Sequence, residues 1–335
     1  MVKGVAISTI AVAVLMGGLV ACSETTEVVA PTLESIPSLT PESELLASEE
    51  VESESVAEVE EDDQTDDLHE TDDEHQIALE ATYLGSYLIN DEAYGTQTTV
   101  TVSNGTRTIL TNALPNHDTG DFPNSGNPNT ITAQSVTYTY TTRPVYTGSS
   151  KEIRIAGVAV NGIKLEPGTA ETVNCNSGET YRVEGLQNSF NLGMDFNNAH
   201  VQPNGEYHYH GLSDLLVNES KISGGDLVHI GFAADGHLIL SSTTGAYLSG
   251  YELGTEARSG TNCTLSLGRN GGKSVTVEGT IPDGTYTSDW IYKGSGNLDE
   301  CNGAIINGEY SYVITVGFPY IPRCLMGEFT ERKRP

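Results

Sequence analysis

Basic residues are scarce in this chain, and so are tryptophan, methionine and cysteine. Its 335 residues include 16 Lys and Arg against 46 Asp and Glu, so the formal net charge at pH 7 is −30. A chain this acidic repels the phosphate backbone of nucleic acid, and we expect no nucleic-acid partner. Nucleophile-elbow, phosphate-loop and His-Glu-x-x-His sequences are also absent, which argues against the common serine-hydrolase, nucleotide-binding and helical zinc-protease sites.

An apolar run near the N-terminus has the parts of a secretory signal. Lys3 provides the positive start, residues 5–15 are apolar but too few to span a bilayer comfortably, and a Leu-Val-Ala-Cys sequence ends at Cys22. We interpret residues 1–21 as a lipoprotein signal peptide and Cys22 as the lipid-attachment site. The alternative is an ordinary signal peptide with an incidental cysteine. Several acyl chains on one residue would anchor the exported protein lastingly to the cell envelope, and the Ser-Glu pair after Cys22 favours the outer membrane.

Residues 22–80 have a composition of their own. Residues 23–80 contain 21 Asp and Glu, no Lys or Arg and no aromatic residue. Such a segment cannot bury enough apolar surface to offset the loss of chain entropy, so we expect a disordered, self-repelling tether. His69 and His75 lie among its carboxylates and offer weak binding of divalent cations, although a solvated acidic spacer is the favoured interpretation.

Residues 81–335 are rich in Tyr, Thr, Val, Ile and Gly and are enough for one large domain. Strand-like stretches bounded by Gly, Asn, Asp and Pro recur at 98–102, 135–141, 152–160, 180–183, 227–232, 273–278 and 310–316. Helical periodicity is nearly absent, and only residues 212–217 predict a short turn of helix. We therefore predict a mainly β fold, a single β-sandwich-like domain with long loops and little helix, behind the acidic tether.

Five cysteines are an awkward number for an exported protein, but assigning Cys22 to lipid leaves four. In an oxidising compartment these most simply form two disulfides, for which three connectivities are possible. We favour Cys301 with Cys324, and Cys175 with Cys263. A thiolate metal site is the alternative, but the spacings are long and no C-x-x-C pair exists.

Histidines are concentrated around one turn. The Pro-Asn-Gly sequence at 203–205 suits a three-residue hairpin loop, with Gly in the left-handed position. If Gln202 pairs with Glu206, counting outward places His200 directly opposite His208. The sequence thus predicts a hairpin whose two strands both carry histidine.

Strand periodicity then places three imidazoles on one face. His208 and His210 share a side of their strand, and His200 joins them because directly opposed residues share a face. Three nitrogen ligands with one position left open suit a transition metal, zinc or copper. The prediction depends on register, because a two-residue turn would place His200 opposite Tyr209, on the wrong face. The alternatives are a structural polar network and an organic ligand stacked on a Tyr-His surface.

Asp195, five residues before His200, is a further candidate. Its carboxylate is suited to bind the metal, to orient an imidazole or to move protons. With Asn197 and Asn198 it also offers oxygen ligands for Ca²⁺, a minor alternative.

The Tyr-His-Tyr-His sequence at 207–210, preceded by Asn-Ala-His-Val-Gln-Pro at 198–203, resembles the YHYH domain family of secreted proteins. The other matching pieces are Leu-Pro-Asn-His at 114–117, Phe-Pro-Asn at 122–124, Asn-Pro-Asn at 127–129, Gly-Val-Ala-Val-Asn-Gly at 157–162, Ala-Ala-Asp-Gly at 233–236, Gly-Asn-Leu-Asp-Glu-Cys-Asn-Gly at 296–303 and Phe-Pro-Tyr-Ile-Pro-Arg-Cys at 318–324. The resemblance covers residues 114–327. Members of the family usually follow Asp-Gly with Phe-Pro-Ile-Tyr, where this chain has His-Leu-Ile-Leu at 237–240.

The resemblance implies one exported domain and indicates that the histidine hairpin is its main functional part. It also points to His117, Asp235 and Asp299, because each lies in a matched polar motif far from the hairpin in sequence. His117 is a candidate fourth ligand or acid–base group. Asp235 and Asp299 are candidate supporting groups or alternative ligands, although each also suits a structural turn. His229, in an apolar strand, and His237 are left outside the site.

Two classes of function remain open. One is a metal-binding domain, either a metal-dependent hydrolase in which His117 or Asp195 moves protons, or a protein that captures metal. The other is a non-catalytic module that binds a glycan or another envelope component and uses the Tyr/His hairpin structurally. The expected partners are a metal ion and, through the lipid, a membrane; the residues indicate no particular protein partner.

Overall fold

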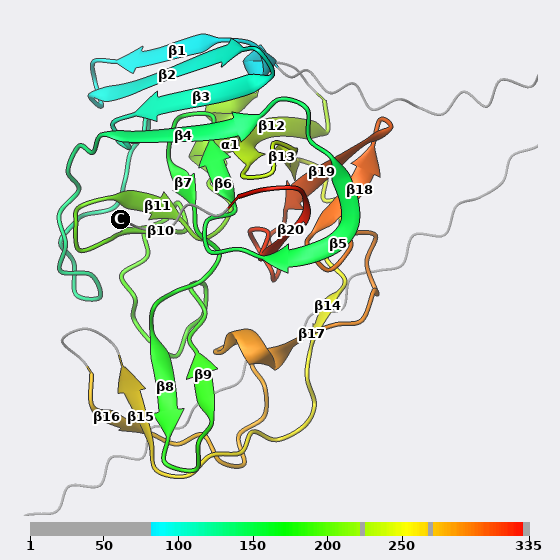
Figure 1. Cartoon of the computed structure of the whole chain (residues 1–335). Coiled ribbons are helices and arrows are strands. Elements are labelled where there is room, and N and C mark those ends of the chain that lie inside the picture. Colours follow the sequence, from blue (N-terminus) through cyan, green and yellow to red (C-terminus); the bar gives the residue numbers. More distant parts are fainter. Residues whose placement is uncertain (1–81, 222–224, 267–270, 331–335) are drawn as a thin grey trace, which may run out of the picture. The chain divides into compact units, whose positions relative to one another are not determined.

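The computed structural model of the chain describes residues 82–221, 225–266 and 271–330 (Figure 1). The signal peptide, Cys22 and the acidic tether with His69 and His75 lie outside these residues. The described residues all belong to one compact unit, residues 70–335. In the described part of the chain, no helix is both long enough and apolar enough to cross a membrane.

A four-stranded antiparallel sheet, in the order β1-β2-β3-β4, opens the described chain. Its strands are β1 (Tyr87–Asp91), β2 (Thr96–Ser103), β3 (Thr106–Thr111) and β4 (Val136–Thr141). Burial alternates along β2, where Thr96, Thr98 and Val100 face the core while the residues between them are exposed. Alternation of this kind is typical of a sheet that covers a core with one face and meets solvent with the other.

The largest sheet has eight strands in the order β10-β11-β7-β6-β12-β13-β19-β18. They are β10 (Ala199–Val201), β11 (Tyr207–Tyr209), β7 (Lys164–Leu165), β6 (Gly157–Ala159), β12 (Leu227–Ala233), β13 (Leu238–Ser242), β19 (Glu309–Ile314) and β18 (Gly303–Ile306). Every residue of β12 is buried, because this central strand is covered on both faces. The histidine hairpin, β10 and β11, forms one edge of the sheet.

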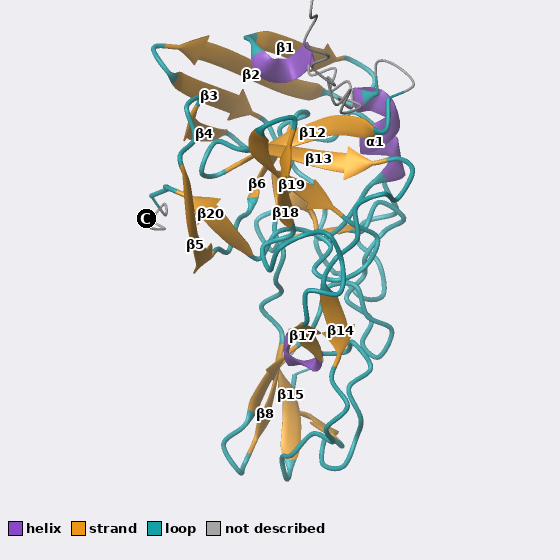
Figure 2. Ribbon diagram, turned by 90° about the vertical axis from the view of Figure 1, so that its right-hand side faces the viewer, coloured by secondary structure: helices purple, strands orange, loops and turns teal. Residues whose placement is uncertain are grey.

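These two sheets share the main hydrophobic core. Val100 and Ile109 of the four-stranded sheet belong to the same buried cluster as Ile230 and Phe232 of β12. Arg107 lies with its guanidinium carbon 3.7 Å from the centre of the Phe232 ring, which joins the two layers by a cation–π contact. Figures 1 and 2 both show the first sheet lying across the β12–β13 part of the second. The prediction of a mainly β, sandwich-like fold is confirmed.

A second, smaller core lies under another four-stranded sheet, in the order β16-β15-β8-β9. Its strands are β16 (Lys273–Val275), β15 (Cys263–Ser266), β8 (Thr172–Cys175) and β9 (Thr180–Arg182). Two short pairs complete the strands: β14 (Tyr251–Leu253) with β17 (Trp290–Tyr292), and β5 (Tyr146–Glu152) with β20 (Cys324–Gly327). Within the unit of residues 70–335, both views place the smaller core's sheet at the end away from β1–β4 (Figure 2).

Helix is rare among the described residues. The α-helix α1 (Asp214–Ser220) follows the histidine hairpin, and the Ser213 hydroxyl caps its start by accepting a hydrogen bond from the Leu216 amide. The described part of the chain has two 3-10 turns, η1 (Thr82–Leu84) and η3 (Thr287–Asp289). Compared with α1, the turn of helix predicted at 212–217 begins two residues too early.

Most strand predictions agree with the structure to within a few residues, but the stretch at 152–160 is divided. Strand β5 ends at Glu152 and β6 begins at Gly157, and the two strands belong to different sheets. The chain therefore crosses between sheets where local composition indicated one continuous strand.

Both favoured disulfides are present, Cys175–Cys263 and Cys301–Cys324. The first joins directly opposed residues of β8 and β15, beside the smaller core. The second joins Cys301, two residues before the hairpin β18–β19, to Cys324 at the start of β20.

Candidate metal centre

The histidine hairpin has the register that its turn predicts. His200 pairs with His208 and Val201 with Tyr207, while the Gln202 amide donates a 2.9 Å hydrogen bond to the Glu206 carbonyl. Gly205 has a φ of +87°, the left-handed conformation that closes the three-residue loop. The prediction that His200 stands opposite His208 is confirmed, and Figure 1 shows β10 and β11 side by side.

Three imidazoles meet on one face of this hairpin. The ring centroids of His200, His208 and His210 are each 4.7 Å from the other two, so the rings form an equilateral triangle. The Nε2 atom of His210 lies 3.1 Å from that of His200 and 3.0 Å from that of His208. Two nitrogen ligands of a tetrahedral zinc ion are separated by roughly 3.3 Å, which follows from Zn–N bonds of about 2.0–2.1 Å. Both distances from His210 are thus within a few tenths of an ångström of a ligand separation.

Backbone carbonyls orient two of the three rings. The Nδ1 atom of His200 lies 3.0 Å from the Leu192 carbonyl oxygen, and the Nδ1 atom of His208 lies 3.3 Å from that of Glu206. A carbonyl only accepts, so each Nδ1 carries the proton and each Nε2 presents a lone pair to the cluster. This is how metal-binding histidines are commonly held. The Nδ1 of His210 is buried and has no hydrogen-bond partner among the described residues.

The surroundings favour neutral imidazoles. Burial lowers the pKa of His200 and holds the pKa values of His208 and His210 well below the usual value. The pKa of His208 is lowered further by the other two imidazoles and by Lys164, and that of His210 by His200, Arg323 and Lys164. Neutral histidine is the form that binds a metal ion.

A buried charged network, missed from the sequence, borders the cluster. Lys164 on β7 is only 3% exposed, and its ammonium lies 3.0 Å from Glu166 and 3.1 Å from Glu206. Gln202 donates a 2.8 Å hydrogen bond to the same Glu166 oxygen, which is also 3.9 Å from the Nε2 of His208. Two carboxylates therefore share one ammonium beside three neutral rings, and a cation in the cluster would balance the remaining negative charge.

One sequence pattern could have indicated this network. Charged Lys164 and Glu166 alternate with the fully buried Ile163 and Leu165, which is the pattern of a strand with one polar face. The strand β7 itself has only two residues, too short for composition alone to indicate it.

Asp195 and His117 lie on the opposite face of the hairpin, where Tyr207 and Tyr209 point. The Tyr207 hydroxyl donates a 2.7 Å hydrogen bond to Asp195, which also accepts from the amides of Asn197, Ala199 and Gly120. The Nε2 of His117 lies 2.5 Å from the Tyr209 hydroxyl. The structure does not bring either residue to the three imidazoles, because odd and even positions of β11 face opposite ways.

The side chains considered for Ca²⁺ are hydrogen-bonded within the protein. Besides Asp195, the Asn197 amide donates to the Asp118 carbonyl and accepts from Ser213, and Asn198 donates to the Leu212 carbonyl. They tie the loop before the hairpin to its neighbours.

Asp235 and Asp299 each stabilise a turn. Asp235 is fully buried and accepts hydrogen bonds from the Tyr312 hydroxyl and from the amides of His237 and Gly327. Asp299 accepts from the amides of Cys301 and Gly303 and from the Tyr310 hydroxyl. Burial raises the pKa of Asp299. Neither carboxylate belongs to the histidine cluster.

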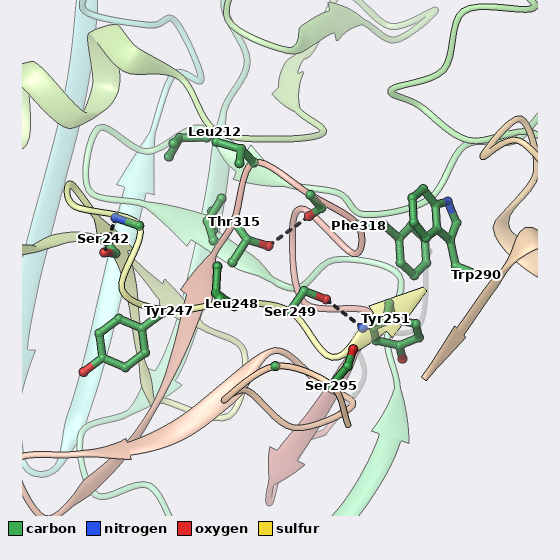
Figure 3. Close-up of a pocket in the computed structure, with 15 residues that line it drawn as sticks. Leu212, Ser242, Tyr247, Leu248, Ser249, Tyr251, Trp290, Ser295, Thr315 and Phe318 are labelled. Carbon is green, nitrogen blue, oxygen red and sulfur yellow. Dashed lines mark hydrogen bonds between the residues drawn. The ribbon is translucent and has the colours of Figure 1, made fainter. Parts of the chain in front are cut away.

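A separate cleft is lined by aromatic and small residues, and Figure 3 shows it in close-up. Its volume is about 410 Å³, within the range of small-molecule sites. The rings of Trp290 and Phe318 stack 5.0 Å apart at its wall, next to Tyr251. Leu248, which is 60% exposed, lies between them and Tyr247, and none of the described residues lining the cleft is charged.

A family model described as YHYH protein matches residues 134–327 of the chain. No curated protein and no solved structure matches it. The matched segment contains the histidine hairpin, Lys164 and Glu166, and it begins after the Leu-Pro-Asn-His sequence at 114–117 that also suggested the resemblance.

Proposed function

The chain belongs to the YHYH protein family, and from this premise we propose that His200, His208 and His210 bind one transition-metal ion, zinc or copper. The observation that carries the proposal is that the Nε2 atom of His210 lies 3.1 and 3.0 Å from those of His200 and His208, close to the separation in a tetrahedral ligand set, with the ligand atoms of all three within 4.8 Å of one another. Imidazole is a preferred ligand of both metals. The negative charge left by Glu166 and Glu206 around one ammonium favours a cation at the same place.

A three-histidine site supports hydrolysis as well as capture of metal. Three protein ligands leave a fourth position open, and an ion bound there would lower the pKa of a water molecule to near neutrality. The cluster is largely buried, with His208 and His210 each 2% exposed, so a substrate would approach from the side of His200 and Glu166, whose side chains retain some exposure. We propose metal-assisted hydrolysis as the activity, with metal capture as the simpler use of the same ligands.

The metal is tested on purified protein without an affinity tag, by elemental analysis after dialysis. The wild type is expected to retain about one equivalent of zinc or copper, as a three-imidazole site requires. The variant His208→Ala/His210→Ala should retain less than about a tenth of that, since one imidazole alone binds weakly.

His237→Phe is the matched control, because it removes a buried imidazole outside the cluster. Phe is also the residue that the family usually has after Asp-Gly. This variant should keep the metal. A wild-type content as low as that of the double variant would contradict the proposal.

The aromatic cleft favours a second candidate function, a non-catalytic module that binds an uncharged glycan or another envelope component. Tyr207 and Tyr209 are fully buried, so the hairpin offers no tyrosine surface for stacking. The reachable aromatic residues line the cleft instead. A metal-free wild type would leave this function as the better-supported one.

We also propose that the protein is exported and anchored to the bacterial envelope by lipid on Cys22, with the acidic segment up to residue 80 as a tether. The lipobox sequence and the composition of residues 23–80 support this. Cys22→Ala should move the protein from the membrane fraction to the soluble fraction and abolish incorporation of labelled palmitate. Unchanged membrane association would contradict the anchor.

A further inference from the structure

Three strands place their polar side chains in register around the histidine cluster. His200 on β10 pairs with His208 on β11, which in turn pairs with Lys164 on β7. Two residues further along the same face, His210 comes directly after β11 and Glu166 directly after β7. Glu166 is thus held beside the cluster by the sheet itself, because its amide donates a 2.9 Å hydrogen bond to the Tyr209 carbonyl.

The carboxylate of Glu166 is close to one imidazole without joining the ligand set. Its Oε2 atom lies 3.9 Å from the Nε2 of His208. Only the three histidines form a group whose donor atoms all lie within 4.8 Å of one another in the described part of the chain. An oxygen in that place is too far to be a fourth ligand, but it is within reach of a water molecule bound at the fourth position.

Two neighbours hold this oxygen in place. Lys164 and Gln202 both contact the Oε2 of Glu166, at 3.0 and 2.8 Å. Neither is a metal ligand of the proposed set. The carboxylate is therefore oriented independently of any bound ion.

We propose that Glu166 positions the water of the metal centre: it accepts a hydrogen bond from water at the fourth coordination position and keeps anions away from it. This inference rests on the proposed function. Glu166 acts as a positioning residue that selects water over an anion as the fourth ligand. The choice matters for function, because a site that holds water is equipped for hydrolysis, whereas a site filled by an anion is suited only to storage.

The test uses Co²⁺-loaded protein and azide as the probe anion, followed by visible absorption. Glu166→Gln should keep one Co²⁺ per chain and bind azide at least about tenfold more tightly, because a negative charge near the anion is gone and the amide can still contact Lys164. Glu206→Gln is the matched control. It removes the same charge from a side chain of the same 11% exposure that shares the same ammonium, and it should change azide affinity by less than about threefold.

Each outcome decides between the ideas. Equal tightening in both variants would reduce the effect to net charge and overturn the proposal. Loss of Co²⁺ from Glu166→Gln would make Glu166 a ligand, which overturns the proposal and leaves metal binding intact. A wild type that binds no Co²⁺ would instead overturn the proposed function.

A second measurement needs no variant. In Cu²⁺-loaded wild type transferred to D₂O, pulsed electron paramagnetic resonance should detect deuterium coupling from an equatorial water ligand. A spectrum without that coupling, in protein that holds its copper, would overturn the proposal.

Discussion

The histidines of this protein have different roles, and the hydrogen-bond partners of their ring nitrogens distinguish these roles. His200 and His208 direct Nδ1 at backbone carbonyls and leave Nε2 for the cluster. His117 contacts a tyrosine hydroxyl, and His229 contacts the Gly231 carbonyl through Nε2 from within the core. The residue type by itself does not distinguish them, whereas the partner of each ring nitrogen separates the clustered imidazoles from the structural ones.

His229 should make the fold sensitive to acid. It is buried in the main hydrophobic core, and burial lowers its pKa to about 4. In the unfolded chain its pKa is near 6.5, so between pH 6.5 and 4 the unfolded state binds the extra proton. The contribution of His229 to the free energy of unfolding is fully present above pH 6.5. It decreases by about 3 kcal/mol in all as the pH drops to 4.

The variant His229→Phe removes this titration while preserving an aromatic ring beside Phe232. Urea unfolding at pH 7 and pH 4 should show a smaller acid loss in the variant than in the wild type, by about the same 3 kcal/mol. The cluster histidines titrate in both proteins and cancel in this difference. Equal acid losses would refute the assignment.

At the scale of elements, the hairpin determines which side chains meet. The turn at 203–205 defines the register, and the register brings His200 to His208. Both could be deduced from the sequence because turn chemistry and the two-residue period act over neighbouring residues. The pairing of β11 with β7 could not, since a parallel partner depends on how the whole sheet is assembled.

Gly205 should be the most sensitive point of the hairpin. A Cβ there would overlap the Thr132 hydroxyl, and the φ of +87° disfavours any side chain. Gly245 has a similar φ of +71° but open space around it. Replacing Gly245 by Ala therefore measures the cost of the left-handed backbone conformation without a steric overlap. Gly205→Ala should destabilise the fold by about 2 kcal/mol more than Gly245→Ala and weaken metal binding as well.

Urea unfolding of both variants and competition with a metal chelator would measure these effects. The two glycine variants could instead lose the same stability and both bind metal like the wild type. In that case the hairpin tolerates a side chain at position 205, and the dependence of the histidine cluster on this turn is wrong.

For the molecule as a whole, the histidine cluster lies where the main core and the second core meet. The hairpin packs on the main hydrophobic core, but the carbonyl that orients His200 belongs to Leu192, a residue of the second, smaller core. Gly185 lies against the His210 ring, where a Cβ would approach Nδ1 to 3.0 Å. Residues 185 and 192 both follow β9, so the integrity of the second core should influence the ligands.

The disulfide Cys175–Cys263 tests that coupling. It links residues 88 apart in sequence, and removing it should cost roughly 4 to 5 kcal/mol of stability in the loop-entropy model. Replacing both cysteines by serine should loosen the second core and weaken metal affinity severalfold. Replacing Cys301 and Cys324, which are 23 apart, should cost about 1 kcal/mol less and affect metal affinity less.

Unfolding curves and metal titrations of the two double variants provide the comparison. Identical metal affinities in both would show that the second core plays no part in orienting His200.

The sequence by itself determined the features that depend on neighbouring residues or on simple counting. These are the mainly β composition, the even number of cysteines left after Cys22, and three histidines on one hairpin face. Only the tertiary structure decided what surrounds that face. It brought Lys164 to Glu206, which is 42 positions further along the chain, and it placed His117 and Asp195 behind the hairpin. The physical reason is that a turn specifies its own register, whereas contacts between distant segments follow from how complete sheets pack.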